Sequence, residues 1–303
     1  MLRQAENKCR IEGILSEINL KYGSYVKNGA TIDTIGGDIK VLVQLEINEE
    51  MKDFIIPVYM SAPKLTNAGK ANPAYESIEK VMKEYVSIAS GAGVEGADKI
   101  RITNATVKMN EYYNAQNQLV SFPRINASFI NKATGEFRPE ASWNLEFAVS
   151  SMDFVTDNDG VEVEPKKLRI KAIVPQYGGK VDTMEFYATN PRVIDAISSY
   201  WENGKTYSAK GRLNFTSTTK EIIEEMDFGE PEVRHQTVSV SELIVTSGTQ
   251  SPLEDDMAFA PADLSAALKE HKAYLETLKD KTNTKPHSTP APTSSNQDFD
   301  LGF

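Results

Sequence analysis

Residues 181–194 read VDTMEFYATNPRVI, and this stretch decides the fold. Met184 and Phe186 alternate with polar neighbours, which is the period-two pattern of a β-strand. Asn190 and Pro191 follow, and these residue types are preferred at the cap and at the first position of an α-helix. The stretch therefore predicts a strand that leads into a helix.

The same step from strand to helix occurs earlier in the chain. Asp53–Met60 reads as a strand, and a helix is predicted after Asn72-Pro73. Apolar residues at helical spacing mark the buried face of that helix: Ile78, Val81, Met82 and Tyr85. Four further strands complete this first series, at Lys8–Leu20, Asp38–Ile47, Lys99–Glu111 and Gln118–Asn131.

A second series of elements repeats this order. Strands are predicted at Trp143–Val155, Lys167–Pro175, Val181–Ala188, Thr206–Phe215 and Thr237–Thr246. The helix after Asn190-Pro191 carries Ile194, Ile197 and Trp201, and Gly204 is placed to end it. Ala105–Asn110 of the first series also lines up with Ala209–Asn214 of the second. The repetition indicates a duplicated domain.

Five strands with a helix between the third and the fourth is the order of the OB-fold, a small Greek-key barrel that commonly binds oligonucleotides or oligosaccharides. We therefore expect a mainly β protein with two OB-fold-like five-stranded barrels; another five-stranded β architecture is the alternative. The expected division is 1–133 for the first OB-like domain, 134–142 for a linker, 143–250 for the second domain, 251–281 for a C-terminal helical segment and 282–303 for a disordered tail.

The C-terminal segment contains an amphipathic pattern at Ala262–Lys281. Its apolar stripe consists of Leu264, Ala267, Leu268, Leu275 and Leu278. We expect this stripe to pack on the second barrel or on another copy of the chain, and a partner-binding helix is the alternative.

Bulk composition excludes several classes of protein. The chain has 303 residues, a net charge of −10 and one cysteine, Cys9. No apolar run approaches the roughly 20 residues of a membrane span, and the N-terminus has no signal-peptide pattern. One cysteine excludes disulfide frameworks and multi-cysteine metal sites. We expect a cytoplasmic protein with no membrane partner, no metal and no cofactor.

Two short stretches match catalytic or cofactor-binding motifs, but the neighbouring elements that those motifs require are missing from the sequence. Residues 91–96 read GAGVEG, but they follow a predicted helix and precede a strand, which is the reverse of a dinucleotide-binding turn. Asp227-Phe228-Gly229 copies a kinase tripeptide without the other kinase loops. We expect a protein that is not an enzyme.

A basic stripe is predicted on one strand of the second barrel. Lys167, Arg169 and Lys171 occupy every second position, so their side chains project from one face of that strand. In the OB-fold this region carries much of the ligand face, where a phosphate backbone would run. The alternative is an ordinary solvated face neutralised by Glu162 and Glu164. The first barrel repeats the pattern more weakly with Lys40 and Arg101.

Aromatic residues near these positions suit base stacking, which contributes roughly 1–3 kcal/mol per base. Tyr22 and Tyr25 are expected beside Lys21 and Lys27 in the loop after the first strand. The other candidates are Tyr112 at the end of the fourth strand, Tyr177 with Lys180, and Tyr187 beside Phe186. Only one residue of an adjacent pair faces outward in a strand, so some of these rings belong to the core.

The chain ends in Asp298-Phe299-Asp300-Leu301-Gly302-Phe303, after a polar stretch rich in Thr, Ser and Pro. Such a stretch is expected to stay disordered. Phe303 offers a partner both a ring and an α-carboxylate, so the candidate partner-binding residues are Asp298, Phe299, Asp300, Leu301 and Phe303. An ordinary frayed end is the alternative.

This organisation resembles the phage-type single-stranded DNA-binding proteins, and the tail resembles the acidic tip of their bacterial counterparts. The resemblance implies protection of single strands in phage DNA replication, recombination and repair, with the tip recruiting replication proteins. The tip departs from the bacterial pattern, because it has two Asp and ends Gly302-Phe303 rather than Pro-Phe.

Two other functions remain open on the residues alone. A structural or scaffolding β protein of phage assembly would need no basic groove, and neutralised, scattered cations would favour it. A carbohydrate-binding barrel would need exposed tryptophan, whereas Trp143 and Trp201 lie on apolar faces of their predicted elements.

Overall fold

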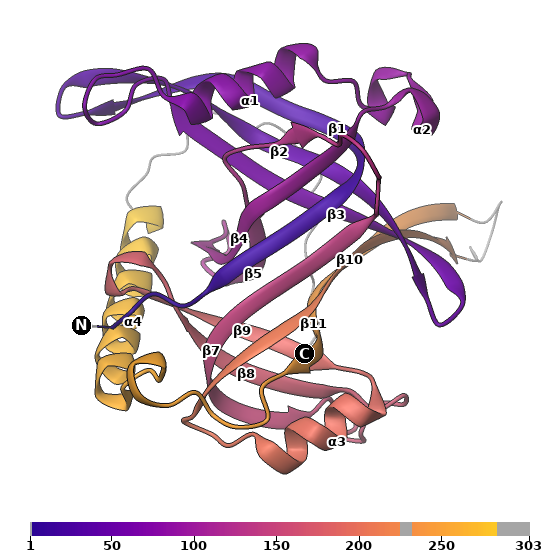
Figure 1. Ribbon diagram of the computed structural model, residues 1–303, viewed down its shortest axis with the longest axis vertical. Coiled ribbons are helices and arrows are strands. Elements are labelled where there is room, and N and C mark those ends of the chain that lie inside the picture. The colour runs from indigo at the N-terminus through magenta and orange to yellow at the C-terminus, as the bar shows by residue number, and fades with distance from the viewer. Residues whose placement is uncertain (1, 225–231, 284–303) are drawn as a thin grey trace.

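The computed structural model describes residues 2–224 and 232–283, of which 217–224, 232–238 and 280–283 are described by their backbone alone (Figure 1). Eleven strands form one continuous sheet, which confirms a mainly β protein. The tail residues Asp298–Phe303 lie outside the described residues.

The first half of the chain forms a closed five-stranded barrel, called barrel 1. Its strands are β1 (Asn7–Lys27), β2 (Ala30–Ile47), β3 (Glu50–Pro63), β4 (Lys99–Tyr113) and β5 (Leu119–Asn126). β1 pairs with β2, β2 with β3, β3 in parallel with β5, β5 with β4, and β4 again with β1. This closure is that of the OB-fold. The helix α1 (Pro73–Glu84) lies between β3 and β4, followed by the short elements η1 (Ile88–Ser90) and α2 (Gly93–Gly96); β6 (Asn131–Lys132) adds to β4.

The second half forms barrel 2 with the same connections. Its strands are β7 (Glu140–Phe154), β8 (Leu168–Pro175), β9 (Val181–Ala188), β10 (Thr206–Glu224) and β11 (Glu232–Gly248), with η2 (Tyr177–Gly179) between β8 and β9 and α3 (Pro191–Tyr200) between β9 and β10. β9 pairs in parallel with β11, and β10 closes on β7. Both barrels also carry a register shift at the same place, after Leu15 in β1 and after Val149 in β7. The duplication therefore extends to an irregularity of the ladder.

The register corrects the sequence alignment of the two halves. Cys9 pairs with Ala105, and Trp143, which lies equally far before its bulge, pairs with Gly211. Ala105 is therefore equivalent to Gly211 and not to Ala209. In strands with alternating apolar and polar residues, an alignment that is displaced by two residues still matches apolar with apolar positions. Sequence similarity alone therefore does not distinguish the correct alignment from one displaced by two residues.

Both helices begin as predicted. The side chain of Asn72 accepts a hydrogen bond from the backbone N–H of Ala74 at 3.1 Å, and that of Asn190 accepts one from Arg192 at 3.0 Å. Each cap is followed by a proline in the first turn, where its missing N–H costs no hydrogen bond. The buried faces include Ile78 of α1 and Ile197 of α3.

Several strands are longer than predicted, and this moves four site candidates. Asn28 and Gly29 have φ of 52° and 78°, so they form a two-residue turn that joins β1 to β2 directly. Lys21, Tyr22, Tyr25 and Lys27 consequently lie in β1, paired with β2, and not in a loop. At the other boundary, residues 140–142, expected in a linker, already belong to β7.

The two barrels are joined by antiparallel pairing of β1 with β7. Cys9 pairs with Trp143, and because these positions are equivalent, the seam has a local two-fold symmetry. Asn7 opposite Leu145 and Ile11 opposite Ala141 are related by the same symmetry. Cys9 is fully buried there, and burial raises the pKa of its thiol to about 12. One face of the seam is therefore buried like a barrel core, whereas alternate residues of β1 there, such as Lys8, are exposed on the other face.

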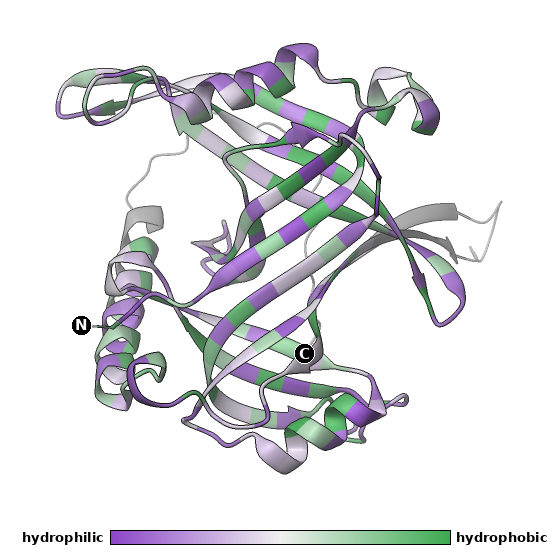
Figure 2. Ribbon diagram, in the orientation of Figure 1, coloured by the Kyte–Doolittle hydropathy of each residue, from purple (hydrophilic) through white to green (hydrophobic). Residues whose placement is uncertain are grey.

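One hydrophobic core runs through both barrels. In barrel 2 it includes a cluster of aromatic rings: Phe147 stacks on Phe186 with ring centroids 4.6 Å apart, and Trp201 stacks on Tyr207 at 4.9 Å. Many strands alternate between hydrophobic and hydrophilic residues (Figure 2). This is the pattern of a sheet that is buried on one face.

The C-terminal segment, η3 (Asp255–Met257) and α4 (Pro261–Asn283), packs across both barrels. α4 contacts β4 of barrel 1 and β9 of barrel 2, with Leu264 and Ala267 buried (Figure 1). The expected packing on the second barrel is present, and α4 also packs on the first barrel, which was not expected. α4 bridges the two, because β4 and β9 also contact each other.

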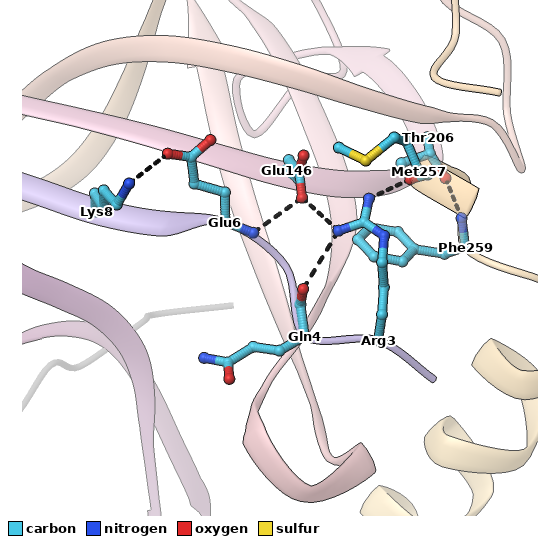
Figure 3. A network of polar contacts seen from close by, with 8 residues as sticks. All are labelled: Arg3, Gln4, Glu6, Lys8, Glu146, Thr206, Met257 and Phe259. Atoms are coloured by element: carbon cyan, nitrogen blue, oxygen red, sulfur yellow. Dashed lines mark hydrogen bonds and ion pairs between the residues drawn. The ribbon is translucent and has the colours of Figure 1, made fainter. Parts of the chain in front are cut away.

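The N-terminal segment fixes the start of this C-terminal segment (Figure 3). Arg3 forms an ion pair with Glu146 of β7 at 2.6 Å, and its guanidinium lies 4.4 Å from the ring centroid of Phe259. Arg3 also donates to the backbone carbonyl of Met257. The backbone N–H of Phe259 donates to Thr206 of β10 at 2.9 Å. Residues from both ends of the chain thus lie against barrel 2.

Gly211 is required beside the seam. A Cβ there would lie 2.0 Å from the carbonyl oxygen of Ile244 and 2.3 Å from Cζ2 of Trp143. We predict that Gly211→Ala lowers the free energy of unfolding by about 3 kcal/mol or more, because the indole cannot move without opening the core. Urea denaturation measures this. Gly96→Ala is the control, since its Cβ would lie 3.3 Å from the side chain of Ala92, and it should change stability by less than about 0.5 kcal/mol. Equal stability of Gly211→Ala and the wild type would contradict the packing described.

A buried carboxyl under α4 predicts a dependence on pH. Burial raises the pKa of Asp182 from 3.8 to about 6, and the charge of Glu111 adds to this, whereas the charges of His271 and Lys108 oppose it. His271 of α4 contacts Glu111 of β4 at 3.3 Å. Between pH values of about 4 and 6 the folded protein holds a proton on Asp182 that the unfolded chain has released, so stability falls as pH rises through this window.

Asp182→Asn removes the charge and keeps an oxygen that can accept the hydrogen bond from the backbone N–H of Met109, now 3.2 Å long. We predict that the variant is more stable than the wild type by about 1–3 kcal/mol at about pH 8. In denaturation curves the difference should grow as pH rises to about 6 and then stay constant. A difference that does not change with pH would show that the charge of Asp182 is not its cause. Glu95→Gln, at an exposed position of α2, is the control.

Candidate nucleic-acid interface

The strands of barrel 1 present one continuous outer face, called face 1. In β2, Asp38 and Lys40 point outward, and Tyr59 of β3 pairs with Asp38. Lys21 of β1 lies on the same side by alternation, and Lys108 of β4 pairs with Arg124 of β5. Face 1 is defined as Glu17, Lys21, Asp38, Lys40, Tyr59, Lys108 and Arg124. It covers the strands that carry the ligand in OB-folds.

Tyr59 and Arg124 form the centre of face 1. The guanidinium carbon of Arg124 lies 4.1 Å from the ring centroid of Tyr59, which is a cation–π contact. Among the described residues Arg124 has no ion pair, and its Nε is buried without a hydrogen-bond partner. Burial raises the pKa of Asp38, and the charges of Arg124 and Lys40 oppose that shift. Arg124 therefore has a net positive charge available to an anion.

Neither Tyr59 nor Arg124 was selected from the sequence. Both of their strands were predicted, but the parallel register of β3 against β5 was not, and Val58 paired with Ile125 is what brings the two side chains together. A signal was present in the alternation of Phe122, Arg124 and Asn126 around buried Ile125.

A hollow of about 350 Å³ lies next to Tyr59. It is lined by Lys21, Tyr22, Gly23, Thr34, Gly36, Gly37, Asp38, Tyr59 and Ser61. Gly37 has φ of 146°, and a Cβ there would lie 2.0 Å from the carbonyl oxygen of Asn19. The volume of the hollow suits a planar polar group such as a nucleobase, and so does its lining, which combines an aromatic ring, hydroxyls, a carboxyl and a cation.

The four candidates in the β1 arm divide between its two sides. Lys21, Tyr25 and Lys27 share the side of Tyr59 by strand alternation, and Tyr25 is about half exposed. Tyr22 lies on the other side, where its hydroxyl donates to Glu79 of α1 at 2.7 Å. This hydrogen bond raises the pKa of Tyr22. Tyr22 is therefore tied to the helix.

The remaining barrel 1 candidates are placed differently from one another. Tyr112 lies on the outer side of β4 and meets Phe122 edge-on, with ring centroids 6.4 Å apart. Lys40 forms an ion pair with Glu17 at 2.6 Å. Arg101 lies toward the opposite end of β4 from Tyr112 and donates twice to Glu12, at 2.7 and 2.8 Å. The structure does not bring Arg101 to face 1.

The predicted basic stripe of barrel 2 does form. Leu168, Ile170 and Ala172 are buried, so Arg169 and Lys171 project outward together with Lys167. We call this outer surface face 2 and define it as Asp153, Lys167, Arg169, Lys171, Glu185, Tyr187, Asn214 and Glu242. The Nζ of Lys167 lies 4.4 Å from the ring centroid of Tyr187. Burial and a hydrogen bond from its hydroxyl to Glu185 raise the pKa of Tyr187.

Carboxylates hold two of the three cations of the stripe. Lys167 forms an ion pair with Glu242, and Arg169 forms one with Asp153. These are not the acids expected from the sequence, because Glu162 instead pairs with Lys166 at 3.0 Å. Asp153 comes from the neighbouring strand β7, and Glu242 comes from β11, which lies beyond β9, so proximity in sequence could not identify either partner.

Tyr177 and Lys180 are not part of face 2. They flank the turn where Pro175 pairs with Val181, and Tyr187 pairs with Arg169 toward the far end of the same hairpin. Tyr177 is 81% exposed. It is available to a ligand that extends beyond face 2.

Within the described residues, 2–224 and 232–283, no group of three His, Cys, Asp or Glu could hold a metal ion.

None of the helices described is long and apolar enough to cross a membrane.

Comparison with known proteins identifies a family, and several solved structures are similar to the chain. The model of the YorF family matches residues 5–281. The wild-type single-stranded DNA binding protein of Thermus aquaticus is 13% identical with a TM-score of 0.49, over 84% of this chain and 96% of that chain. A deletion mutant of that protein is also 13% identical, with a TM-score of 0.48 over 83% and 97%. A Replication Protein A heterotrimer bound to single-stranded DNA is 7% identical, with a TM-score of 0.24 over 89% and 54%. No curated protein matches the sequence.

Proposed function

The chain belongs to the YorF family, and we propose that it binds single-stranded DNA with little sequence preference. The observation that carries this proposal is a tyrosine with a cation over its ring, repeated at equivalent outer positions of both barrels. The distances are 4.1 Å for Arg124 over Tyr59 and 4.4 Å for Lys167 over Tyr187. Both tyrosines lie on the third strand of their barrel, and the second and third strands carry much of the ligand face in OB-folds.

The proposed mechanism combines electrostatics with stacking. Phosphates displace counterions as they meet Lys21, Lys108 and Arg124, which makes affinity fall as salt concentration rises. Bases stack on Tyr59 and on Tyr187, and every base has a face that can stack, so sequence preference is weak. The hollow beside Tyr59 offers space for one unstacked base.

In the cell we propose a role in phage DNA replication, recombination and repair, in the cytoplasm of the host. The protein would cover exposed single strands, and its tip, Asp298–Phe303, would recruit replication proteins. The sequence of the tip supports this part of the proposal, since it presents two carboxylates and a terminal Phe.

A scaffolding role is the second candidate, and the ion pairs of face 2 favour it. Lys167 and Arg169 already have carboxylate partners, as they would on a surface that binds no nucleic acid. Face 1 favours DNA, because Arg124 lacks such a partner among the described residues.

Fluorescence anisotropy of a labelled single strand of about 30 nucleotides tests the proposal, with a duplex of the same sequence as control. We predict binding that is selective for the single strand and weakens steeply with salt. If the protein binds neither oligonucleotide at low salt, with or without its tip, the proposal is wrong and the scaffolding role becomes the first candidate.

The central residue can be tested in the same assay. Tyr59→Ala removes the ring and should weaken binding by about 5- to 150-fold, which corresponds to the loss of one stacked base. Tyr59→Phe keeps the ring and should bind like the wild type. Tyr274→Ala removes a tyrosine of α4 that is not among the residues of face 1 and that is more exposed than Tyr59, and it serves as the control. Equal affinities of Tyr59→Ala and Tyr274→Ala would exclude stacking on Tyr59.

The tip should compete with DNA for the same cations. We predict that deletion of Asp298–Phe303 tightens binding of the single strand at low salt and has no effect at high salt, because the competition is electrostatic. Affinity measured at both salt concentrations decides this. Unchanged affinity at low salt would mean that the tip does not approach the DNA-binding surface.

A further inference from the structure

We propose that the two barrels bind single-stranded DNA unequally: face 1 binds first, and binding to face 2 is weakened by carboxylates that already pair with two of its three cations. This inference rests on the proposed function and concerns the division of binding between the two faces.

The register shows which positions of the two faces correspond. Tyr59 and Tyr187 are equivalent, since each follows the residue that pairs in parallel with the last strand of its barrel. Tyr59 pairs with Asp38, and Tyr187 pairs with Arg169. Asp38 is therefore equivalent to Arg169.

The same register makes Arg124 and Glu242 equivalent, because they precede Ile125 and Leu243, the residues that pair with β3 and β9. The signs of charge around the tyrosine are thus exchanged between the barrels. In face 1 the cation over the ring comes from the last strand, as Arg124. In face 2 that position is Glu242, and the cation over the ring is Lys167.

As a result of this exchange, cations of face 2 form ion pairs with carboxylates of the same face. Glu242 pairs with Lys167 and also accepts a hydrogen bond from Asn214 at 3.1 Å. Asn214 is equivalent to Lys108 of face 1, so a cation of barrel 1 is replaced there by an amide that helps to hold the carboxylate. Arg169 is held by Asp153.

The two faces, as defined above, therefore carry different net charges. Face 1 has four cations, Lys21, Lys40, Lys108 and Arg124, against two carboxylates, Glu17 and Asp38. Face 2 has three cations, Lys167, Arg169 and Lys171, against three carboxylates, Asp153, Glu185 and Glu242. A phosphate is attracted to face 1 by the excess of positive charge, whereas face 2 is neutral as a whole.

The ion pair of Lys167 with Glu242 in face 2 is also less exposed to solvent than the ion pair of face 1. The side chains of Lys167 and Glu242 are 22% and 20% exposed, compared with 45% and 34% for Lys40 and Glu17 of face 1. Solvent screens a shielded ion pair less, so a phosphate has to displace a stronger competitor at Lys167 than at Lys40. Face 2 is thus a site whose own carboxylates compete with the ligand.

Equivalent substitutions in the two barrels test this inference. Arg124→Gln and Lys167→Gln each remove the cation over a tyrosine, and Glu242→Gln releases Lys167 without changing size. Each variant is titrated with single strands of about 8 and about 30 nucleotides across a salt series, a range that spans the site size of one and of several OB-folds. Thermal melting shows which variants are folded, and Lys21→Gln replaces Arg124→Gln if the latter unfolds.

We expect Arg124→Gln to weaken binding of the short strand about tenfold and to reduce the salt slope by about 0.7, the value for one phosphate contact. Lys167→Gln should change that affinity by less than about twofold, because its charge is already neutralised. Glu242→Gln should tighten binding of the long strand about threefold or more and increase its salt slope.

Equal losses in Arg124→Gln and Lys167→Gln would overturn the inference while leaving the proposed function intact. An unchanged affinity in Glu242→Gln would overturn it as well. If the wild-type protein binds neither strand, the proposed function itself fails, so the two failures can be told apart.

Discussion

The antiparallel pairing of β1 with β7 is the interaction on which the rest of the structure depends. It sets Cys9 opposite Trp143 at equivalent positions, so that two barrels become one sheet with a local two-fold axis at the seam. One face of the pairing is buried, and its geometry depends on a glycine, Gly211, that leaves room for the indole of Trp143. Helix α4 then crosses both barrels on β4 and β9. The relative position of faces 1 and 2 follows from this seam, and not from a flexible linker.

The two barrels share their backbone architecture but differ in the charged residues on their outer faces. The strand order, the helix caps and even the bulge after Leu15 and Val149 are the same in both halves. The tyrosine at the centre of each face is also the same. What differs is the source of the cation over it and the number of carboxylates around it. A stacking platform with two different electrostatic environments is the consequence.

Much of the fold could be predicted from the sequence because local rules determine it. Asn72-Pro73 and Asn190-Pro191 mark both helices, and alternation marks ten of the strands, so the topology of the OB-fold follows from their order. Strand ends were less predictable. The turn at Asn28-Gly29 allows β1 and β2 to continue far beyond the part of each strand that carries buried apolar residues. The alternating sequence pattern ends with those apolar residues, so it does not mark the true ends of the strands.

The candidate site could be predicted only in part, because it depends on pairs of residues far apart in the chain. The stripe at Lys167, Arg169 and Lys171 follows from alternation within one strand. Its neutralisation by Glu242 depends on how β11 packs beside β9, and the contact of Arg124 with Tyr59 depends on the parallel register of β5 against β3. Antiparallel hairpins reveal their register through their turns, whereas parallel neighbours joined by a long connection do not.

The most direct test of the central claim, that single-stranded DNA lies on the outer strands of the barrels, is photo-cross-linking. A single strand containing bromodeoxyuridine would be irradiated with the full-length protein, and cross-linked peptides would be identified by mass spectrometry. The account predicts cross-links in the β2–β3 and β4–β5 hairpins, at peptides that contain Tyr59 and Phe122. Cross-links confined to α1 or α4, with none in β3 or β5, would contradict it.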